Sequence, residues 1–208
     1  MSKKVLVTGG AGRIGRIIYE LLGGYHDFTF VDVNGSPNGP RIRRLDLVTD
    51  YVDLTHALLG MDVVIHLAWN PGENWKSRSV VPDNKLIAEN VYSAAMAAGV
   101  KRVVMASSIH ADNFYDWPVE APLMSCGSVA VPRSLYGATK VYIEALGRYY
   151  AATGKTEVVC VRFGGVTLDD VLRDEPGYEK IWLSRRDCAE LVHKCIEAES
   201  VPKGFCAM

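Results

Sequence analysis

The chain has 208 residues, enough for one sizeable buried core and marginal for two. Hydrophobic residues make up 49% of it and charged residues 23%, proportions that are typical of a soluble globular protein. A formal net charge of −1 gives no electrostatic reason to expect nucleic acid or an anionic membrane as a partner. The sequence contains neither an apolar run long enough to cross a bilayer nor a secretory signal pattern, so we expect a cytoplasmic protein.

The first predicted unit is a short strand, a glycine-rich turn and a helix. Residues 5–7 are apolar, and apolar side chains recur at helical spacing through residues 14–22. Between them lies Thr-Gly-Gly-Ala-Gly-Arg-Ile-Gly, residues 8–15. Glycines in such a turn let the backbone approach a pyrophosphate and pack the helix on the sheet, and the helix N-terminus attracts the phosphates. An ordinary glycine-rich turn is the alternative interpretation.

A second apolar strand, residues 28–31, ends at Asp32, about twenty residues past the glycines. An acid at that place binds the ribose hydroxyls of a dinucleotide, so the two strands together predict a dinucleotide site. Asp32 favours NAD because its carboxylate would repel the 2′-phosphate of NADP. Four arginines nearby, Arg13, Arg41, Arg43 and Arg44, are the evidence for NADP, since basic residues accommodate that phosphate.

Strand and helix patterns alternate along the rest of the chain. Predicted strands cover residues 41–47, 62–68, 102–106, 157–162 and 204–208, and predicted helices cover 50–59, 83–99, 134–154 and 187–198. Such alternation predicts an α/β fold, a Rossmann-like doubly wound parallel sheet with helices on both faces. We expect one NAD-binding domain over residues 1–208. Two long loops, 109–133 and 163–184, leave the carboxyl ends of strands, where such sheets bind their substrates.

Tyr136 and Lys140 lie four residues apart on one face of a predicted helix. A phenol titrates near pH 10, too high for a general base at neutral pH, and a neighbouring ammonium favours the phenolate. Ser108 follows a buried strand, where its hydroxyl can both donate to and accept from a reacting oxygen. A coincidental surface pair and a strand-end serine are the alternatives.

Five cysteines, Cys126, Cys160, Cys188, Cys195 and Cys206, are an odd number without Cys-x-x-Cys spacing. They predict reduced, mostly packed thiols rather than a disulfide framework. No His, Cys or carboxylate cluster has the spacing of metal ligands, so we expect no metal.

Taken together, these motifs resemble the extended short-chain dehydrogenase/reductases, the NAD-dependent epimerase/dehydratase relatives. The resemblance covers essentially the whole chain and rests on residues 8–15, Asp32, Asp46-Leu47, His66-Leu67-Ala68, Asn84, Ser107-Ser108 and Tyr136-x-x-x-Lys140. It implies bound NAD, a homodimer paired through the helices predicted at 83–99 and 134–153, and a catalytic group of Ser108, Tyr136 and Lys140. The implied cofactor-binding residues are Gly9, Gly12, Arg13, Ile14, Gly15, Asp32, Asp46, Leu47, Leu67, Ala68, Asn84, Tyr136 and Lys140.

Within the family, residues 106–110 and 162–165 look most like the uronate and sugar dehydrogenase branch. The resemblance implies that Ser108, His110 and Arg173 contact substrate, with a loop histidine and a solvated arginine as equally good interpretations of the last two. Two residues depart from the branch: Ile109 stands where uronate dehydrogenases carry Asn, and Gly165 where they carry Ser. The chain is also shorter than most relatives, so we expect a reduced substrate side or further residues beyond it.

The leading hypothesis is therefore an NAD-dependent dehydrogenase of a sugar or sugar acid. Tyr136 would be the general base, Lys140 would lower its pKa and hold the nicotinamide ribose, and Ser108 would orient the reacting hydroxyl. An epimerase or dehydratase that recycles its NAD is the first alternative, although dehydratases carry an Asp-Glu pair where this chain has Ile109-His110. A non-catalytic, NAD-sensing regulator on the same fold is the second.

Overall fold

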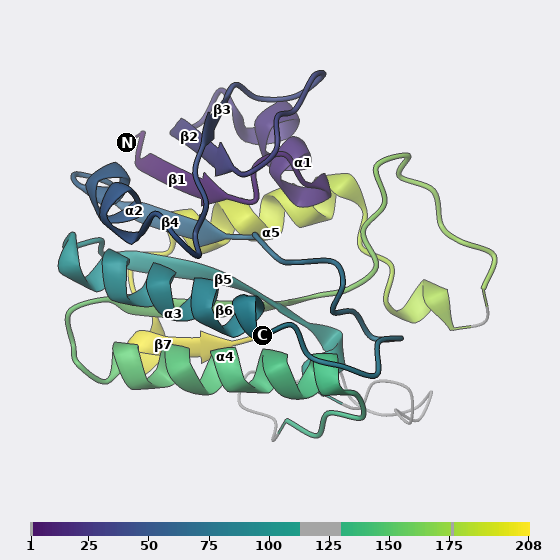
Figure 1. The fold of residues 1–208 in the computed structure, drawn as a ribbon. Coiled ribbons are helices and arrows are strands. Elements are labelled where there is room, and N and C mark those ends of the chain that lie inside the picture. Colours follow the sequence, from purple (N-terminus) through teal and green to yellow (C-terminus); the bar gives the residue numbers. More distant parts are fainter. Residues whose placement is uncertain (1, 113–129, 176) are drawn as a thin grey trace.

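A computed structural model describes residues 2–112, 130–175 and 177–208 of the chain. Its seven strands form one sheet in the order β3-β2-β1-β4-β5-β6-β7, and every neighbouring pair is parallel. Strand order therefore reverses between β1 and β4, which is the switch point where doubly wound sheets bind their ligands. The expected fold class is confirmed (Figure 1).

The elements alternate as predicted along the described chain. Strands are β1 (Lys4–Thr8), β2 (Asp27–Asp32), β3 (Ile42–Arg44), β4 (Val63–His66), β5 (Arg102–Ser108), β6 (Glu157–Phe163) and β7 (Phe205–Ala207). The α-helices are α1 (Arg13–Leu22), α2 (Tyr51–Leu58), α3 (Pro82–Ala97), α4 (Leu135–Ala151) and α5 (Arg185–Glu197). Short 3₁₀ turns at Ile109–Ala111, Tyr178–Lys180 and Pro202–Gly204 complete the order. Within the described ranges, no helix is both long and apolar enough to span a membrane.

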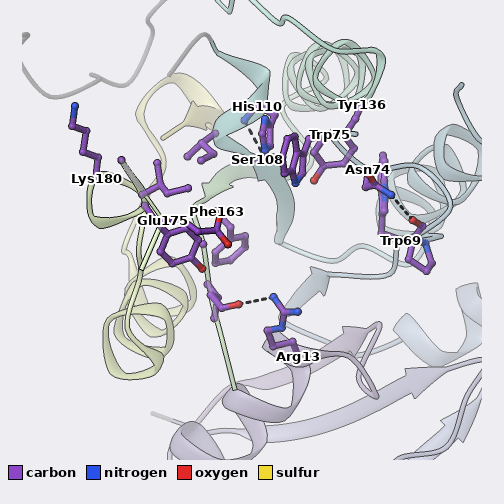
Figure 2. A pocket seen from close by; sticks show the side chains of 18 of the residues that line it. Arg13, Trp69, Asn74, Trp75, Ser108, His110, Tyr136, Phe163, Glu175 and Lys180 are labelled. Carbon is purple, nitrogen blue, oxygen red and sulfur yellow. Dashed lines mark hydrogen bonds between the residues drawn. The ribbon is translucent and has the colours of Figure 1, made fainter. Parts of the chain in front are cut away.

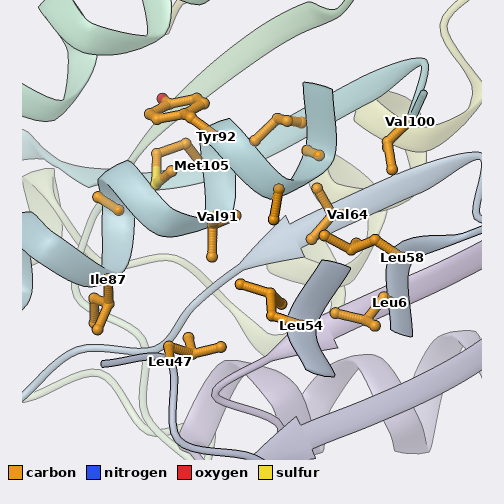
Figure 3. Close-up of a cluster of buried hydrophobic side chains, with 14 of the residues drawn as sticks. Leu6, Leu47, Leu54, Leu58, Val64, Ile87, Val91, Tyr92, Val100 and Met105 are labelled. Atoms are coloured by element: carbon orange, nitrogen blue, oxygen red, sulfur yellow. The ribbon is translucent and has the colours of Figure 1, made fainter. Parts of the chain in front are cut away.

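Two hydrophobic layers hold the helices against the sheet, one on each face. Alternate residues of a strand point to opposite faces, and Leu6 lies in one layer while Val5 and Val7 lie in the other. The first layer packs α2, α3 and α4 on the sheet and contains the buried Tyr92 (Figure 3). The second packs α1 and α5 on the opposite face (Figure 1). Near-continuous apolar strands are therefore the result of burial on both faces.

Most elements differ from the predicted bounds by a few residues, and three of these differences have a clear local reason. Strand β5 runs on to Ser108 because Ser107 and Ser108 pair with β6. Helix α5 begins earlier than expected, since the Ser184 hydroxyl accepts a hydrogen bond from the Asp187 N–H and caps it. Strand β3 is shorter than predicted because the Asp46 carboxylate, beyond its end, accepts from the Val48 N–H and turns the chain towards α2.

Parallel strands place their carboxyl ends at one edge of the sheet, and the predicted site residues gather there. Asp32 ends β2, His66 ends β4 and Ser108 ends β5. Of the two loops expected to face the substrate, 163–184 leaves β6 at this edge and is described apart from residue 176. Most of the other, residues 113–129, lies outside the described residues.

Candidate active site

The glycine turn between β1 and α1 is built for close backbone approach. Gly9 has φ 70°, a left-handed conformation, and a Cβ there would lie 2.5 Å from the backbone nitrogen of Ala68. A Cβ on Gly15 would lie 2.6 Å from the carbonyl oxygen of Gly10. Gly12 is the N-cap of α1, whose first N–H groups have no partner within the helix. This arrangement suits the phosphates of a dinucleotide, as the sequence predicted.

Beyond the turn, a cavity of about 590 Å³ runs along the edge of the sheet towards β2. We call it the dinucleotide groove; it is lined by Gly9, Gly12, Asp32, Asp46, Leu47, Leu67, Ala68, Asn84 and their neighbours. Eight of the residues expected to bind cofactor thus line one cavity. Their chemistry fits the adenosine half of NAD: glycine backbone for phosphate, carboxylate for ribose and leucine for adenine.

The carboxylate of Asp32 is fixed at the mouth of the groove. One oxygen accepts a hydrogen bond from the Ala11 N–H at 3.1 Å, and the other accepts from the Asn34 N–H at 2.9 Å. Each carboxylate oxygen has a second lone pair with which to accept from a ribose hydroxyl. The four arginines that favoured NADP are not among the residues lining this groove, and the charged residues that line it, Asp32, Asp46 and Asp83, are all acids that would repel a 2′-phosphate.

Arg13 extends away from the dinucleotide groove. Its side chain reaches from the first turn of α1 to the loop after β6, where Nη1 donates to the carbonyl oxygen of Val166 at 2.5 Å (Figure 2). The guanidinium therefore ties the glycine turn to the substrate-side loop. It lines the two cavities described next rather than the dinucleotide groove.

Ser108, Tyr136 and Lys140 meet where the groove passes under the end of β5. A cavity of about 280 Å³, the junction pocket, is lined by these three residues together with Gly9, Gly12, Arg13, Ile14, Leu67 and Trp69. The Ser108 side chain lies close enough to Tyr136 to lower the pKa of the phenol, and its hydroxyl accepts a hydrogen bond from the His110 N–H at 3.3 Å. Lys140 Nζ donates to the Ala106 carbonyl oxygen at 2.9 Å and lies 5.5 Å from the centre of the Tyr136 ring.

Electrostatics at the junction pocket differ from expectation in one respect. We expected Lys140 to lower the pKa of Tyr136, but burial raises the pKa of Tyr136, and Ser108 opposes that rise only in part. Burial also lowers the pKa of Lys140 to about 7, with the Glu73 carboxylate as the largest opposing influence. Burial is therefore the largest influence on the pKa of the phenol in this structure, followed by the opposing effect of Ser108.

On the far side of the junction pocket opens a larger, aromatic cavity of about 630 Å³ (Figure 2). Its walls carry Trp69, Trp75, His110, Tyr136, Phe163 and Tyr178, with Arg13, Glu73, Glu175 and Lys180 as charged residues. The His110 ring stacks on Trp75 with 5.7 Å between ring centroids and meets Tyr136 edge-on at 5.6 Å. Burial lowers the pKa of His110 to about 4, so it faces the cavity as a neutral imidazole.

Of the three expected substrate contacts, Ser108 and His110 line the aromatic cavity and Arg173 does not. Arg173 is exposed and forms an ion pair with Asp169 at 3.1 Å, one turn away in the loop. The carboxylate or phosphate clamp expected from this residue is therefore not part of the cavity in the structure, because a nearer acid holds the guanidinium on the surface.

Gly165 departs from the dehydrogenase branch for a reason that the structure makes plain. A Cβ at Gly165 would lie 2.6 Å from Tyr178 Oη and 2.7 Å from Tyr178 Cζ. The Tyr178 phenol therefore occupies the space that a serine side chain at 165 would need. Compared with a wall that has serine at position 165, this cavity wall lacks the serine hydroxyl and has the Tyr178 hydroxyl in its place.

A buried charged network supports the site from behind. Arg162 donates to Glu144 through Nε at 2.9 Å and Nη2 at 2.8 Å, and Ser107 Oγ donates to the same carboxylate at 2.5 Å. Glu144 lies on the helix of Tyr136 and Lys140, while Ser107 precedes Ser108 on β5. The network therefore fixes the spacing between the strand that carries Ser108 and the helix that carries the other two.

Sequence reasoning missed Trp69 and Glu73, which lie in the loop between β4 and α3. Trp69 lines all three cavities, with Lys140 Nζ 3.5 Å from the centre of its ring. Glu73 is fully buried, and its Oε2 accepts from the Val81 N–H at 2.8 Å and from Asn84 Nδ2 at 3.2 Å. The one available signal was an acid and a tryptophan following a strand end of the predicted sheet.

Comparison with known proteins agrees with this geometry. Residues 5–180 match the NAD dependent epimerase/dehydratase family. The chain belongs to that family. Its dinucleotide is therefore NAD, the cofactor that gives the family its description and that the glycine turn and Asp32 fit.

Two relatives come from Haloferax volcanii. An L-arabinose 1-dehydrogenase (NAD(P)(+)) is 34% identical over 94% of this chain and 83% of its own length. An NAD-dependent glucose-6-phosphate dehydrogenase is 32% identical over 96% of this chain and 82% of its own length. Among solved structures, uronate dehydrogenase from Agrobacterium tumefaciens superposes with a TM-score of 0.77 at 26% identity, covering 99% of this chain and 76% of that one. These similar proteins are dehydrogenases of sugars and sugar acids.

Proposed function

We propose that this chain is an NAD-dependent dehydrogenase of the short-chain dehydrogenase/reductase superfamily that oxidises a hydroxyl group of a sugar or sugar acid. The observation that carries the proposal is the junction pocket, where Ser108, Tyr136 and Lys140 separate a dinucleotide groove from an aromatic cavity. A substrate in the aromatic cavity and NAD in the groove would meet at these three side chains. Aromatic walls with a few polar groups suit the apolar faces and the hydroxyls of a sugar ring.

In the proposed reaction, a C–H bond and an O–H bond of the substrate break and a C=O bond forms. When bound in the groove, NAD would supply the hydride acceptor and a positive charge beside the phenol. The hydroxyl proton would pass to Tyr136 Oη in its phenolate form, and Ser108 Oγ, in the same pocket, would orient the reacting oxygen beside it. The added positive charge would offset the burial that raises the pKa of Tyr136.

Lys140 has the second role in this proposal, that of holding the nicotinamide ribose. Its ammonium lies in the junction pocket, beside both Trp69 and Tyr136. The Lys140 ammonium has three N–H groups, and only one of them is needed for the hydrogen bond to the Ala106 carbonyl oxygen. His110, neutral near pH 7 and beside Tyr136 in the cavity wall, would hydrogen-bond a substrate hydroxyl.

A screen against aldoses, uronates and sugar phosphates tests the proposal. The purified chain, supplied with NAD or NADP, should reduce the dinucleotide stoichiometrically with at least one sugar and should prefer NAD. An epimerase or dehydratase that recycles its cofactor is the second candidate function, and it would convert sugar without accumulating reduced dinucleotide. Tight NAD binding with no conversion of any sugar would contradict both and favour a regulator.

We also propose that two copies of the chain pair through α3 and α4. Large apolar side chains are exposed on or beside these helices, including Leu86, Leu135, Tyr142 and Tyr149. Helices α3 and α4 pack side by side on one face of the sheet (Figure 1), so their outer surfaces could form a continuous interface. A solution mass of one chain by light scattering at assay concentration would contradict this pairing.

A further inference from the structure

The loop of residues 69–81, between β4 and α3, contains an acid without a counterion of its own. Glu73 is 0% exposed, and its Oε1 has no hydrogen-bond partner among the described residues. Nor does Glu73 form an ion pair with any residue that the structure describes. Burying a carboxylate with only one of its two oxygens hydrogen-bonded costs free energy, so we expect this carboxylate to have a structural or functional role.

One role of Glu73 is to fix the conformation of this loop. Oε2 of Glu73 accepts from the Val81 N–H, at the start of α3, and from Asn84 Nδ2. The Glu73 backbone carbonyl oxygen in turn accepts from Trp69 Nε1 at 2.7 Å. One residue therefore fixes both the entry to α3 and the orientation of the Trp69 indole.

The Trp69 ring contacts the Lys140 ammonium. Its face lies 3.5 Å from Lys140 Nζ, close enough for a strong cation–π contact in a buried setting, and its plane meets the Tyr136 ring edge-on at 82°. Lys140 is itself 4% exposed. The residue that orients this indole thus carries a buried carboxylate, while a buried ammonium lies over the ring, and in a low-dielectric interior such charges attract without direct contact.

Other titratable groups also face Lys140, but each is either neutral or already in an ion pair. Glu73 is therefore the acid near Lys140 that has no ion-pair partner among the described residues. They are His66 on β4, Cys160 on β6, and Tyr136 and Glu144 on its own helix. Burial lowers the pKa of His66 to about 3 and raises the pKa of Cys160 to about 12, so both are neutral at neutral pH. Glu144 is already paired with Arg162.

We propose that Glu73 is a positioning residue of the active site: it orients Trp69 against the Lys140 ammonium and supplies the negative charge that balances that ammonium. Glu73 acts through Trp69 and Lys140 and does not touch the reacting atoms. The significance of the balance rests on the proposed function, in which Lys140 must carry its charge to serve Tyr136 and the ribose.

The first test follows the Lys140 ammonium itself and needs neither substrate nor NAD. The chain labelled with ¹³C-lysine is titrated by NMR, and the Lys140 Cε signal is assigned by its loss in Lys140→Met. Because burial lowers the pKa of Lys140 to about 7 against the opposing pull of Glu73, the wild-type signal should titrate near pH 7. Glu73→Gln, which keeps the size but not the charge, should move that titration to lower pH.

Two matched variants show whether the charge is responsible. Glu73→Asp keeps the carboxylate and should titrate closer to the wild type than Glu73→Gln does. Glu190→Gln removes an exposed carboxylate from α5 and should leave the Lys140 titration unchanged. An unchanged Lys140 titration in a folded Glu73→Gln variant would overturn the proposal.

If Glu73→Gln does not fold, the double variant Glu73→Gln with Lys140→Met decides the question. Removing one member of a buried charge pair leaves the other uncompensated, whereas removing both is tolerated much better. The double variant should therefore fold, because neither buried charge is left to be compensated. A double variant that fails to fold like Glu73→Gln, although Lys140→Met folds, would overturn the charge balance.

Activity gives an independent readout once a substrate is known. Glu73 raises the pKa of both Lys140 and Tyr136, so both limbs of the pH profile of kcat/KM should move to lower pH in Glu73→Gln. A loss of loop packing alone would lower the rate without moving the limbs. If no sugar is oxidised but the Lys140 titration shifts, the proposed function fails while the role of Glu73 stands.

Discussion

Gly165 and Tyr178 compete for one space in the substrate-side wall, since a Cβ at 165 would lie 2.6 Å from the Tyr178 hydroxyl oxygen. Gly165→Ser should therefore displace the Tyr178 ring and change the cavity while leaving the dinucleotide groove intact. We expect KM for the sugar to rise several-fold and Kd for NAD to stay within the error of its measurement. Steady-state kinetics and calorimetric titration with NAD check this.

The control for that prediction is Gly165→Ser combined with Tyr178→Ala, which supplies the missing space. The double variant should bind sugar better than Gly165→Ser alone. If Gly165→Ser and the wild type have equal KM values, Tyr178 does not form this wall in solution.

Tyr136→Phe removes the proposed general base without removing the ring that contacts Trp69 and His110. Positioned proton transfer contributes typically about 10²–10⁴ to a rate, so kcat should fall by about that factor. NAD affinity should change little. Tyr149→Phe, on the same helix but with a 67% exposed side chain, is the matched control and should keep the parent rate.

Asp32→Ala removes the carboxylate at the mouth of the dinucleotide groove. Hydrogen bonds to charged groups contribute about 1.5–3 kcal/mol each, so NAD affinity should fall by about tenfold or more, and discrimination against NADP should shrink. Asp27→Ala removes an acid from the opposite end of the same strand and should alter neither. Equal affinities of Asp32→Ala and the wild type for NAD would place the ribose elsewhere.

Glu144→Ala breaks the buried network that links β5, β6 and α4. Arg162, whose side chain is only 6% exposed, would lose its closer partner and keep Asp112, which lies 3.5 Å from Nη1. Breaking a buried ion pair costs about 3–5 kcal/mol, and the remaining carboxylate offsets part of that cost, so we expect the free energy of unfolding, measured in urea, to fall by about 3 kcal/mol. Glu190→Ala, at an exposed ion pair, should cost at most about 1 kcal/mol.

Acid should destabilise the chain through His66, which is buried and hydrogen-bonded to the Thr8 hydroxyl at 2.7 Å. Burial and the Lys140 charge lower the pKa of His66 to about 3, while an unfolded histidine titrates near 6.5. The unfolded state therefore binds the proton first, and the stability present above pH 6.5 is lost as pH falls towards 3. Unfolding midpoints measured across that window should fall less steeply in His66→Asn than in the wild type or in the exposed His56→Asn.

Much of the fold and part of the candidate site could be predicted, because they depend on residues that are close together in the sequence. The glycine turn, Asp32 and the Tyr136–Lys140 spacing depend on residues close together in sequence, and alternating apolar runs fix which strands are buried. The seven parallel strands are confirmed for that reason. Asp46, Leu47, Leu67 and Ala68 followed from the resemblance and line the predicted groove.

Non-local contacts account for the differences. Arg13 donates to the Val166 carbonyl oxygen, and Glu73 raises the pKa of Lys140. Both pairs are far apart in the sequence, so no periodic pattern could predict these interactions. Arg173 looked available to substrate because the pattern could not show that Asp169 holds it. The pKa of Tyr136 depends on how deeply the phenol is buried, and burial is a property of the packed loops rather than of a motif.

The most direct test of the central claim follows the hydride. A sugar selected by the screen, deuterated at the carbon that becomes oxidised, is incubated with the chain and excess NAD, and the dinucleotide is recovered for mass spectrometry. The account predicts reduced NAD that carries one deuterium, formed in step with oxidised sugar and nearly abolished in Tyr136→Phe. Sugar product that retains the deuterium, with the dinucleotide left oxidised and unlabelled, would contradict it.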